Sequence, residues 1–207
     1  PIWKVKAEDG EGVRPFELDE LRKLLEACQH DHERRFTLLA IANAQRPTSI
    51  LQLTWDRIDA RQGIADYNVP GRRRTKKRRA LAPIAPLALA YLEAHRSVGP
   101  VVQWKGKQLA GYKMTFQRIA RRAGVAGSAY GIRKAVAIWL RQQGVPELDI
   151  KGMLGHSMSG QTERYAHYRP EYMRAAATSM EALLRGICPG WLASYLPAQP
   201  EHQTQVI

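Results

Sequence analysis

Apolar residues recur at intervals of three and four over most of this chain, a pattern that predicts a largely helical protein. Proline and glycine mark several ends of the predicted helices. Pro47 and Pro146 suit the first position of a helix, where the missing N–H costs nothing, and Gly155 suits a helix end. The segments with this pattern are about 16–28, 33–44, 47–53, 84–92, 112–122, 132–144, 146–155 and 171–185.

The helical spacing is interrupted between residues 55 and 83, where short extended pieces replace it. They span 55–59, 64–69 and 80–84, with turn and basic residues between them. We interpret them as a small antiparallel sheet that carries a basic hairpin at residues 71–79. The predicted fold class is therefore α+β: a mostly α-helical domain with a small three-stranded antiparallel β-sheet.

The two ends of the chain lack these patterns. Residues 1–15 contain Gly10, Gly12 and Pro15, and we interpret them as the end of a linker. Residues 188–207 contain three prolines and little periodicity, so we expect a tail that is mobile or docks on a partner. The folded domain is predicted to span residues 16–187.

The balance of charge points to an anionic partner. The 207 residues include 32 Lys and Arg against 19 Asp and Glu, a formal net charge of +13. Such an excess favours nucleic acid over a membrane surface, because Lys and Arg contacts with phosphates release counterions. The sequence has no apolar run long enough for a membrane helix, and Pro1-Ile-Trp-Lys does not have the pattern expected of a signal peptide. We expect a soluble, non-secreted protein in the cytoplasm, associated with the nucleoid.

Two cysteines, Cys28 and Cys188, lie at opposite ends of the chain and have no CxxC spacing. This arrangement argues against a zinc site or a disulfide framework. We expect both thiols to be reduced.

Candidate chemistry gathers in the basic run and in three later motifs. Residues 72–79 contain seven basic residues in eight, which on composition alone also fits a solvated loop that attracts phosphate. The later motifs are Tyr130-Gly-Ile-Arg133, Leu154-Gly-His156 and Thr162-Glu-Arg-Tyr165. Tyr165 follows His156 by nine residues, so both side chains can face one small site. The candidate DNA-binding residues of the basic run are Arg72, Arg73, Arg74, Lys77, Arg78 and Arg79.

Five sequence features, taken in order along the chain, resemble the catalytic domain of the tyrosine recombinases, the phage integrase family. They are Arg46 before a helix that leads into Trp55-Asp-Arg-Ile-Asp59, a hairpin lysine, Arg133, Leu-Gly-His, and the tyrosine nine residues later. The resemblance covers about residues 16–185. It implies strand cleavage and rejoining through a 3′-phosphotyrosyl link, with neither a metal nor a nucleotide cofactor.

The resemblance also implies a role for each candidate catalytic residue. Tyr165 would attack the phosphodiester, and Arg46 and Arg133 would hold its non-bridging oxygens with their planar guanidinium groups. Lys76 would protonate the departing 5′ oxygen, with Lys77 as the close alternative. His156 would bind a phosphate oxygen or order the nucleophile. Tyr168 competes as the nucleophile, although it follows His156 by twelve residues.

Two residues depart from the family pattern. Tyr130 stands where a histidine is usual, and a phenol with its ordinary pKa near 10 is a poor general base at neutral pH. Ser49 replaces an acidic residue that would buttress Arg46, whose orientation must then come from elsewhere. A further set of arginines is interpreted as positioning the protein on backbone phosphates: Arg34, Arg35, Arg121 and Arg122.

The sequence thus favours a site-specific DNA recombinase of the phage or genomic-island integrase type. Its expected partners are double-stranded DNA, a preceding smaller DNA-binding domain, and three further protomers in a tetramer on two duplexes, with a monomer expected for the isolated domain. The tail resembles a family segment that docks on a neighbouring protomer. Alternatives are a type IB topoisomerase, a non-catalytic DNA-binding relic of the family and a basic RNA-binding protein. The DNA target and the direction of recombination are not encoded in a recognisable motif.

Overall fold

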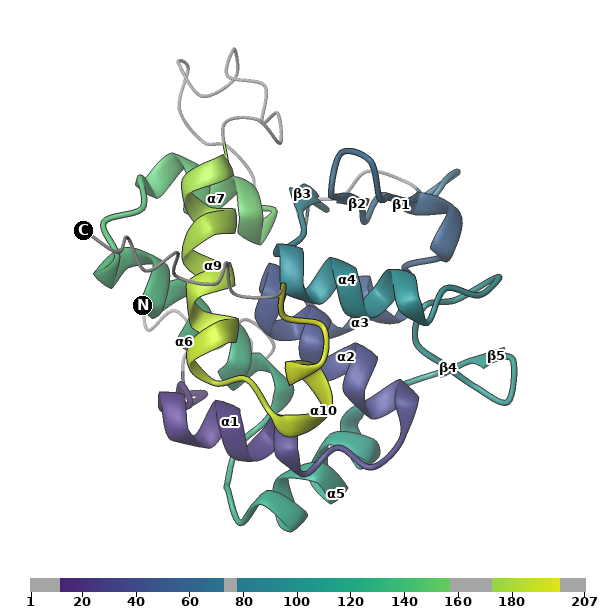
Figure 1. Cartoon of the computed structure of the whole chain (residues 1–207), viewed down its shortest axis with the longest axis horizontal. Coiled ribbons are helices and arrows are strands. Elements are labelled where there is room, and N and C mark those ends of the chain that lie inside the picture. Colours follow the sequence, from purple (N-terminus) through teal and green to yellow (C-terminus); the bar gives the residue numbers. More distant parts are fainter. Residues whose placement is uncertain (1–11, 73–77, 157–172, 198–207) are drawn as a thin grey trace, which may run out of the picture.

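The structure is a computed structural model that describes residues 12–72, 78–156 and 173–197. Within them the chain forms a mostly helical domain with a small antiparallel sheet, which confirms the predicted fold class (Figure 1). The helices are α1 (Leu18–Glu26), α2 (Asp31–Asn43), α3 (Pro47–Leu51), α4 (Pro86–Ala94), α5 (Lys113–Ala123), α6 (Ala129–Gln142), α7 (Glu147–Leu154), α9 (Arg174–Gly186) and α10 (Gly190–Ala193). The strands are β1 (Ile58–Asp59), β2 (Ile64–Asp66), β3 (Leu81–Pro83), β4 (Gln103–Trp104) and β5 (Lys107–Gln108).

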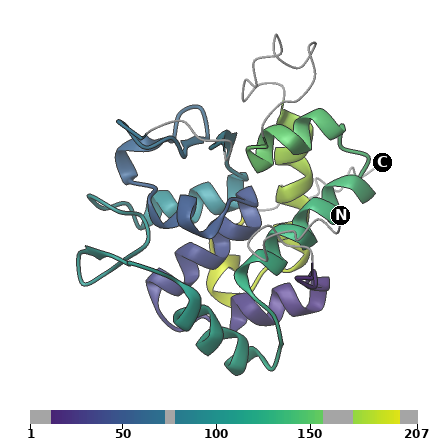
Figure 2. The same ribbon diagram turned by 180° about the vertical axis from the view of Figure 1, so that it is seen from behind.

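Helix α2 is the centre of the domain. It packs against α1, α3, α4, α5, α6 and α9, and every residue from Arg35 to Asn43 is buried. Figures 1 and 2 show it in the middle of the fold from opposite sides, with the other helices around it. Because a helix covered on all sides needs apolar residues on all sides, its sequence shows little separation of polar and apolar faces. The C-terminal end of α2 therefore lies where several elements meet.

The three predicted extended pieces form a sheet of order β1-β2-β3 with antiparallel neighbours. Ala65 in β2 pairs with Ile58 on one side and with Ala82 on the other. The basic run thus joins two paired strands, as predicted, and α7 packs against β3. One part of the prediction is wrong: Trp55–Arg57 forms a 3-10 turn rather than a strand. Arg57 donates to the Thr54 hydroxyl at 3.0 Å, a local side-chain bond that stabilises the turn.

The tail begins as an ordered part of the domain. Helix α10 lies in the stretch predicted to lack pattern, and it begins directly after Pro189. Trp191 donates from Nε1 to the Leu25 carbonyl at 3.1 Å, and Leu192 is fully buried. Residues 187–195 thus pack on their own chain, whereas residues 198–207 lie outside the described residues.

The N-terminal boundary of the folded part lies slightly earlier than expected. Phe16 is buried, and Arg14 forms an ion pair with Glu20 at 2.7 Å. Arg14 also donates to the Ala126 carbonyl at 2.9 Å, so the chain is already tied to the domain two residues before Phe16. Residues 1–11 of the predicted linker lie outside the described residues.

Two arginines interpreted as phosphate-positioning groups have contacts within the fold, and for Arg35, which is buried, that interpretation is wrong. Arg35 is buried with its guanidinium 5.6 Å from the centre of the Trp55 ring. Arg122 forms an ion pair at 2.5 Å with Glu33, whose side chain is only 2% exposed. An unpaired carboxylate at that depth would cost several kcal/mol, so Arg122 stabilises the buried Glu33 although it is itself exposed. Arg121 remains exposed.

Cys28 and Cys188 are both free thiols. Burial raises the pKa of Cys28 to about 12, so its thiolate is scarce at neutral pH. No helix among the described residues is long and apolar enough to cross a membrane.

Candidate active site

Four predicted catalytic residues fall within the described chain: Arg46, Tyr130, Arg133 and His156. Three of the predicted DNA-binding residues, Arg72, Arg78 and Arg79, are also described. The predicted general acid and nucleophile lie outside the described residues, together with their alternatives and the other basic residues of the hairpin. These are Arg73, Arg74, Lys76, Lys77, Tyr165 and Tyr168.

Arg46 sits in the turn between α2 and α3. The chain leaves α2 at Ala44, which adopts a left-handed conformation with φ 49°, and Arg46 caps the N-terminus of α3 in extended conformation. Pro47 at the first turn fixes the direction of α3, as predicted. The Arg46 guanidinium donates to the carbonyls of Arg78 at 3.0 Å and Gly155 at 3.4 Å. Backbone carbonyls therefore help to orient Arg46 where Ser49 offers no carboxylate.

The C-terminal end of α7 is where the side chains of the candidate site come together. The last carbonyls of a helix have no partner within the helix, and here three successive ones accept from side chains of other elements. The Met153 carbonyl accepts from the Gln45 amide, Leu154 from Arg133 at 2.6 Å and Gly155 from Arg46. Arg46, Arg133 and the start of the segment that leads to His156 are thereby brought together.

Arg133 connects α6 to the C-terminal ends of two helices, α2 and α7. It donates from Nη1 to the Ala44 carbonyl and from Nη2 to the Leu154 carbonyl, each at 2.6 Å. Burial, followed by the nearby charge of Arg46, lowers the pKa of Arg133 to about 9. The guanidinium still keeps its proton at pH 7. Because its acceptors are neutral carbonyls, its positive charge is available to an anion.

His156 follows the left-handed Gly155, and its backbone N–H donates to the Lys151 carbonyl at 3.0 Å. Its ring reaches the surface. Partial burial, followed by the charges of Arg133, Arg46 and Lys151, lowers the pKa of His156 to about 4. The imidazole is therefore neutral at pH 7, where it can donate one hydrogen bond and accept another.

This shift predicts how the site responds to acid. The pKa of His156 in the folded protein lies below its ordinary 6.5, so the unfolded chain binds the proton more readily. We expect the contribution of His156 to stability to be complete above pH 6.5 and to fall as the pH drops toward 4. An NMR titration of the ring should give a midpoint near 4, and a midpoint near 6.5 would contradict the described arrangement. His156→Gln should remove this part of the acid dependence of unfolding.

Gly155 allows the basic hairpin to approach α7 closely. It has φ 62°, and a Cβ atom built there would lie 3.0 Å from the Arg78 carbonyl oxygen and 3.2 Å from the Ala80 nitrogen. The second leg of the hairpin therefore runs directly beside the Leu-Gly-His motif. Glycine is required here twice, for the backbone conformation and for the space.

Gly155→Ala should destabilise the domain more than the same change at a glycine with open space. Gly144 is the matched control, because it has φ 71° and a Cβ atom added there would meet no atom within 4 Å. We expect about 1 kcal/mol for Gly144→Ala and about 2–3 kcal/mol for Gly155→Ala, measured by urea unfolding. Equal losses in the two variants would show that the hairpin does not press on Gly155.

The basic residues of the hairpin differ in what they face. Arg72 is exposed and Arg78 is half-buried, whereas the Arg79 side chain is turned inward. Arg79 donates to the Tyr67 carbonyl at 3.3 Å and to the side-chain oxygen of Gln52. Burial, followed by the charges of Arg72, Arg57 and Arg46, lowers the pKa of Arg79 to about 10.

Tyr130 lies one turn before Arg133 on α6, and its side chain is half-buried. It lines a cavity of about 310 Å³ formed between α3, α5 and the start of α6, with Pro47 and Lys113 among the other lining residues.

Among the described residues, no cluster of three or more His, Cys, Asp or Glu side chains could hold a metal ion.

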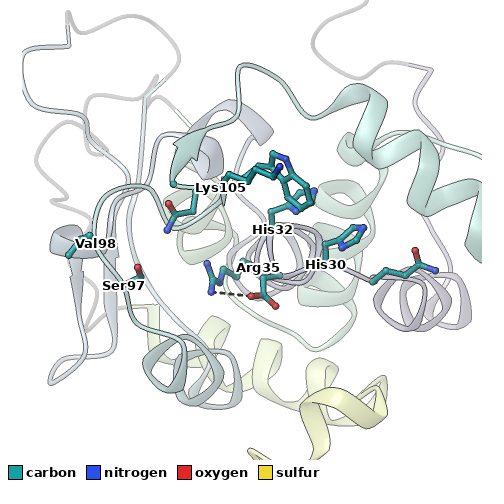
Figure 3. A pocket seen from close by; sticks show the side chains of 11 residues that line it. His30, His32, Arg35, Ser97, Val98 and Lys105 are labelled. Atoms are coloured by element: carbon teal, nitrogen blue, oxygen red, sulfur yellow. Dashed lines mark ion pairs between the residues drawn. The ribbon is translucent and has the colours of Figure 1, made fainter.

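A larger cavity, of about 700 Å³, opens at the other end of α2. His30, His32, Arg35 and Lys105 line it, and Asp31 pairs with Arg35 at 3.8 Å (Figure 3). Arg35 is the lining residue furthest along α2, and it lies eight residues, about 12 Å of helix, before the last residue of α2. None of the four described catalytic candidates lines this cavity, so cavity size alone does not identify the site.

Sequence reasoning missed two residues that build the site. Gln45 and Asn43 are fully or almost fully buried, and their amides donate to Met153 and to the Pro83 carbonyl of β3. The signal available was weak: two amide side chains just before Arg46, at the predicted end of a buried helix.

Comparisons with known proteins identify the family and the fold. The family model described as the phage integrase family matches residues 14–171. No curated protein sequence matches the chain. Among solved structures, the integrase from mycobacterium phage Brujita superposes with a TM-score of 0.62 at 20% identity, over 82% of this chain and 57% of that one.

Two further structures have the same fold. XerA recombinase superposes with a TM-score of 0.58 at 12% identity, over 80% of this chain and 64% of that one. Lambda integrase, as a dimer bound to a COC′ core site, gives a TM-score of 0.58 at 16% identity, over 80% and 65%. The present chain thus spans 57–65% of the length of these structures.

Proposed function

Because the chain belongs to the phage integrase family, we propose that it is the catalytic part of a site-specific tyrosine recombinase that cuts and rejoins DNA strands. The observation that carries this proposal is the junction at the end of α7. There, Arg46 and Arg133 meet beside His156, with carbonyl groups as acceptors for both arginines. Two guanidinium groups held in this way form a site for one phosphate group.

In the proposed reaction, Tyr165 loses its hydroxyl proton to water as its oxygen attacks a phosphodiester whose non-bridging oxygens are bound by Arg46 and Arg133. The bond from phosphorus to the 5′ oxygen breaks, and Lys76, or Lys77 in its place, gives a proton to that oxygen. The DNA is left joined to Tyr165 through its 3′ phosphate. Rejoining reverses these steps with a 5′ hydroxyl from another strand, so the phosphotyrosyl bond conserves the energy that rejoining needs. The chemistry requires neither a metal ion nor ATP.

The neutral ring of His156 fits a hydrogen-bonding role in this scheme. With its pKa lowered to about 4, it holds no proton to release at neutral pH beyond the one on its ring N–H. It can donate that N–H to a phosphate oxygen, or order Tyr165 for attack. Tyr130, one turn before Arg133, would donate its hydroxyl to the same phosphate.

The proposed partner is double-stranded DNA. Arg72 and Arg78 lie on the described part of the basic hairpin, and with Arg73, Arg74 and Lys77 they would contact backbone phosphates. Arg79 is turned inward, so we assign it to supporting the hairpin rather than to DNA. The lambda integrase structure, bound to its core site, supports a DNA partner for this fold. Acting on DNA would place the protein on the nucleoid.

The proposed architecture extends beyond this chain. The domain that begins at Arg14 and includes α10 would be the catalytic domain, and the residues before Arg14 would connect it to a preceding DNA-binding domain. The partial coverage of the related structures agrees with such an addition. Recombination would require four protomers on two duplexes, whereas the domain alone would be a monomer.

Covalent capture tests this function directly. The protein, with and without a preceding domain from its parent sequence, is incubated with a library of nicked duplexes, denatured, and any DNA that remains attached is sequenced. A recombinase should retain DNA with one shared sequence, and heat-denatured protein is the control for non-specific retention. Specific binding without attached DNA would favour a DNA-binding relic. Attachment without sequence preference, with relaxation of supercoiled plasmid, would favour a topoisomerase.

A further inference from the structure

Gln45 occupies a position that neither the sequence motifs nor the proposed chemistry accounts for. It lies between the end of α2 and Arg46, and it is 2% exposed. A buried amide is costly unless it is hydrogen-bonded. Its Nε2 donates to the carbonyl of Asn43 at 3.0 Å and to the carbonyl of Met153.

Both acceptors are carbonyls at helix ends. Asn43 is the last residue of α2, and Met153 lies in the last turn of α7. Carbonyls at these positions cannot be satisfied within their own helices. Gln45 therefore joins the C-terminal ends of two helices through a single NH₂ group.

Arg133 makes a similar connection between the residues that directly follow Asn43 and Met153. Its guanidinium joins the Ala44 carbonyl to the Leu154 carbonyl, next to the two carbonyls joined by Gln45. The two helix ends are thus held together by one charged and one neutral side chain. Two C-terminal helix ends carry partial negative charge and repel each other weakly, so the connections oppose a real tendency to separate.

We propose that Gln45 is a positioning residue for the active site, which holds the end of α7 against the end of α2 so that Arg133 is free to bind phosphate. This inference rests on the function proposed above. When the Arg133 guanidinium donates hydrogen bonds to a substrate, its bonds to the two helix ends weaken. Gln45 would then keep these helix ends together. Glutamine fits this role because it donates hydrogen bonds without adding charge to a site that already contains Arg46 and Arg133.

The experiment uses two neutral replacements, which add no charge to the site. A change in the pKa of His156 would then come from a shift in the position of the end of α7. Gln45→Met keeps the length of the side chain and removes the donor. Gln45→Asn keeps the amide but shortens its reach, and it provides a milder variant in case Gln45→Met fails to fold. Gln143→Met, at the exposed end of α6, is the matched control.

The first readout is the pKa of His156, measured by NMR on the DNA-free protein. In the native protein this pKa is held low by partial burial and by Arg133, Arg46 and Lys151. If Gln45 holds the end of α7 in place, both Gln45 variants should raise the pKa of His156 by about one unit or more toward 6.5, while Gln143→Met leaves it unchanged. An unchanged pKa of His156 in a folded Gln45 variant would overturn the proposal.

The second readout is strand cleavage on a captured DNA site. We expect about a 10- to 100-fold lower cleavage rate in the Gln45 variants, with the dissociation constant for DNA changed less than about threefold. A native cleavage rate in either folded variant would also overturn the proposal. If the unmodified protein does not cleave DNA, the proposed function fails, and the NMR titration still decides whether Gln45 positions His156.

Discussion

Tyr165→Phe should abolish covalent attachment of DNA and leave DNA binding intact. The change removes one oxygen atom, the proposed nucleophile, and nothing else from the side chain. Because the covalent intermediate forms on this oxygen in the proposed reaction, we expect cleavage to fall by about 10⁴-fold or more. The dissociation constant for DNA, measured by a fluorescence shift of a labelled duplex, should change by less than about threefold, since a phenol hydroxyl contributes little to backbone binding.

Tyr168→Phe is the matched control for this prediction. It makes the same chemical change three residues away, in the other tyrosine that could serve as the nucleophile. Cleavage by Tyr168→Phe should stay within a few-fold of the unmodified protein. The reverse result, with Tyr168→Phe inactive and Tyr165→Phe active, would move the nucleophile to Tyr168.

Arg133→Lys should lower the cleavage rate by about 10²- to 10³-fold, although it keeps the positive charge. Arg133 donates to two carbonyls, Ala44 and Leu154, that belong to different elements, and it has further N–H groups for a phosphate. A lysine ammonium is a compact point charge and cannot match this planar geometry. The loss should appear in the rate of cleavage at saturating DNA.

Arg141→Lys is the control for the loss of a guanidinium from α6. Arg141 lies in the last turn of the same helix, eight residues after Arg133, and is exposed. We expect cleavage by Arg141→Lys to be close to that of the unmodified protein. Cleavage by Arg133→Lys at a comparable rate would show that Arg133 supplies only charge, and the phosphate site described at the end of α7 would be wrong.

The helical part of the fold could be predicted closely because its signal is periodic. Pro47 and Gly155 mark helix ends by their own backbone preferences, and both act as predicted. Elements of two to four residues have too few positions for a period to show. For this reason the sequence did not predict the β4–β5 hairpin, helix α10 or the 3-10 turn at Trp55. Each depends on a local bond or on packing against residues far away in sequence.

The site residues could be predicted only as a set of motifs. Arg46, Arg133 and His156 lie together, but what holds them is the row of carbonyls from Met153 to Gly155. Backbone carbonyls are the same in every sequence, so no residue type announces them. Gln45 was missed for that reason. The burial of Arg79 was missed because nothing in the basic run distinguishes one arginine from another. Arg72, in the same run, is exposed.

The most direct test of the central claim is to identify the atom that carries DNA after cleavage. The covalent complex is formed on a nicked duplex with or without EDTA, and after excess Mg²⁺ is added it is digested with protease and nuclease, and the modified peptide is analysed by mass spectrometry. We expect a nucleotide joined through its 3′ phosphate to the peptide that contains Tyr165, in the same yield with and without EDTA during cleavage. A 5′ linkage, attachment to a residue that is not a tyrosine, or loss of the complex in EDTA would contradict the assignment of this chain as a metal-independent tyrosine recombinase.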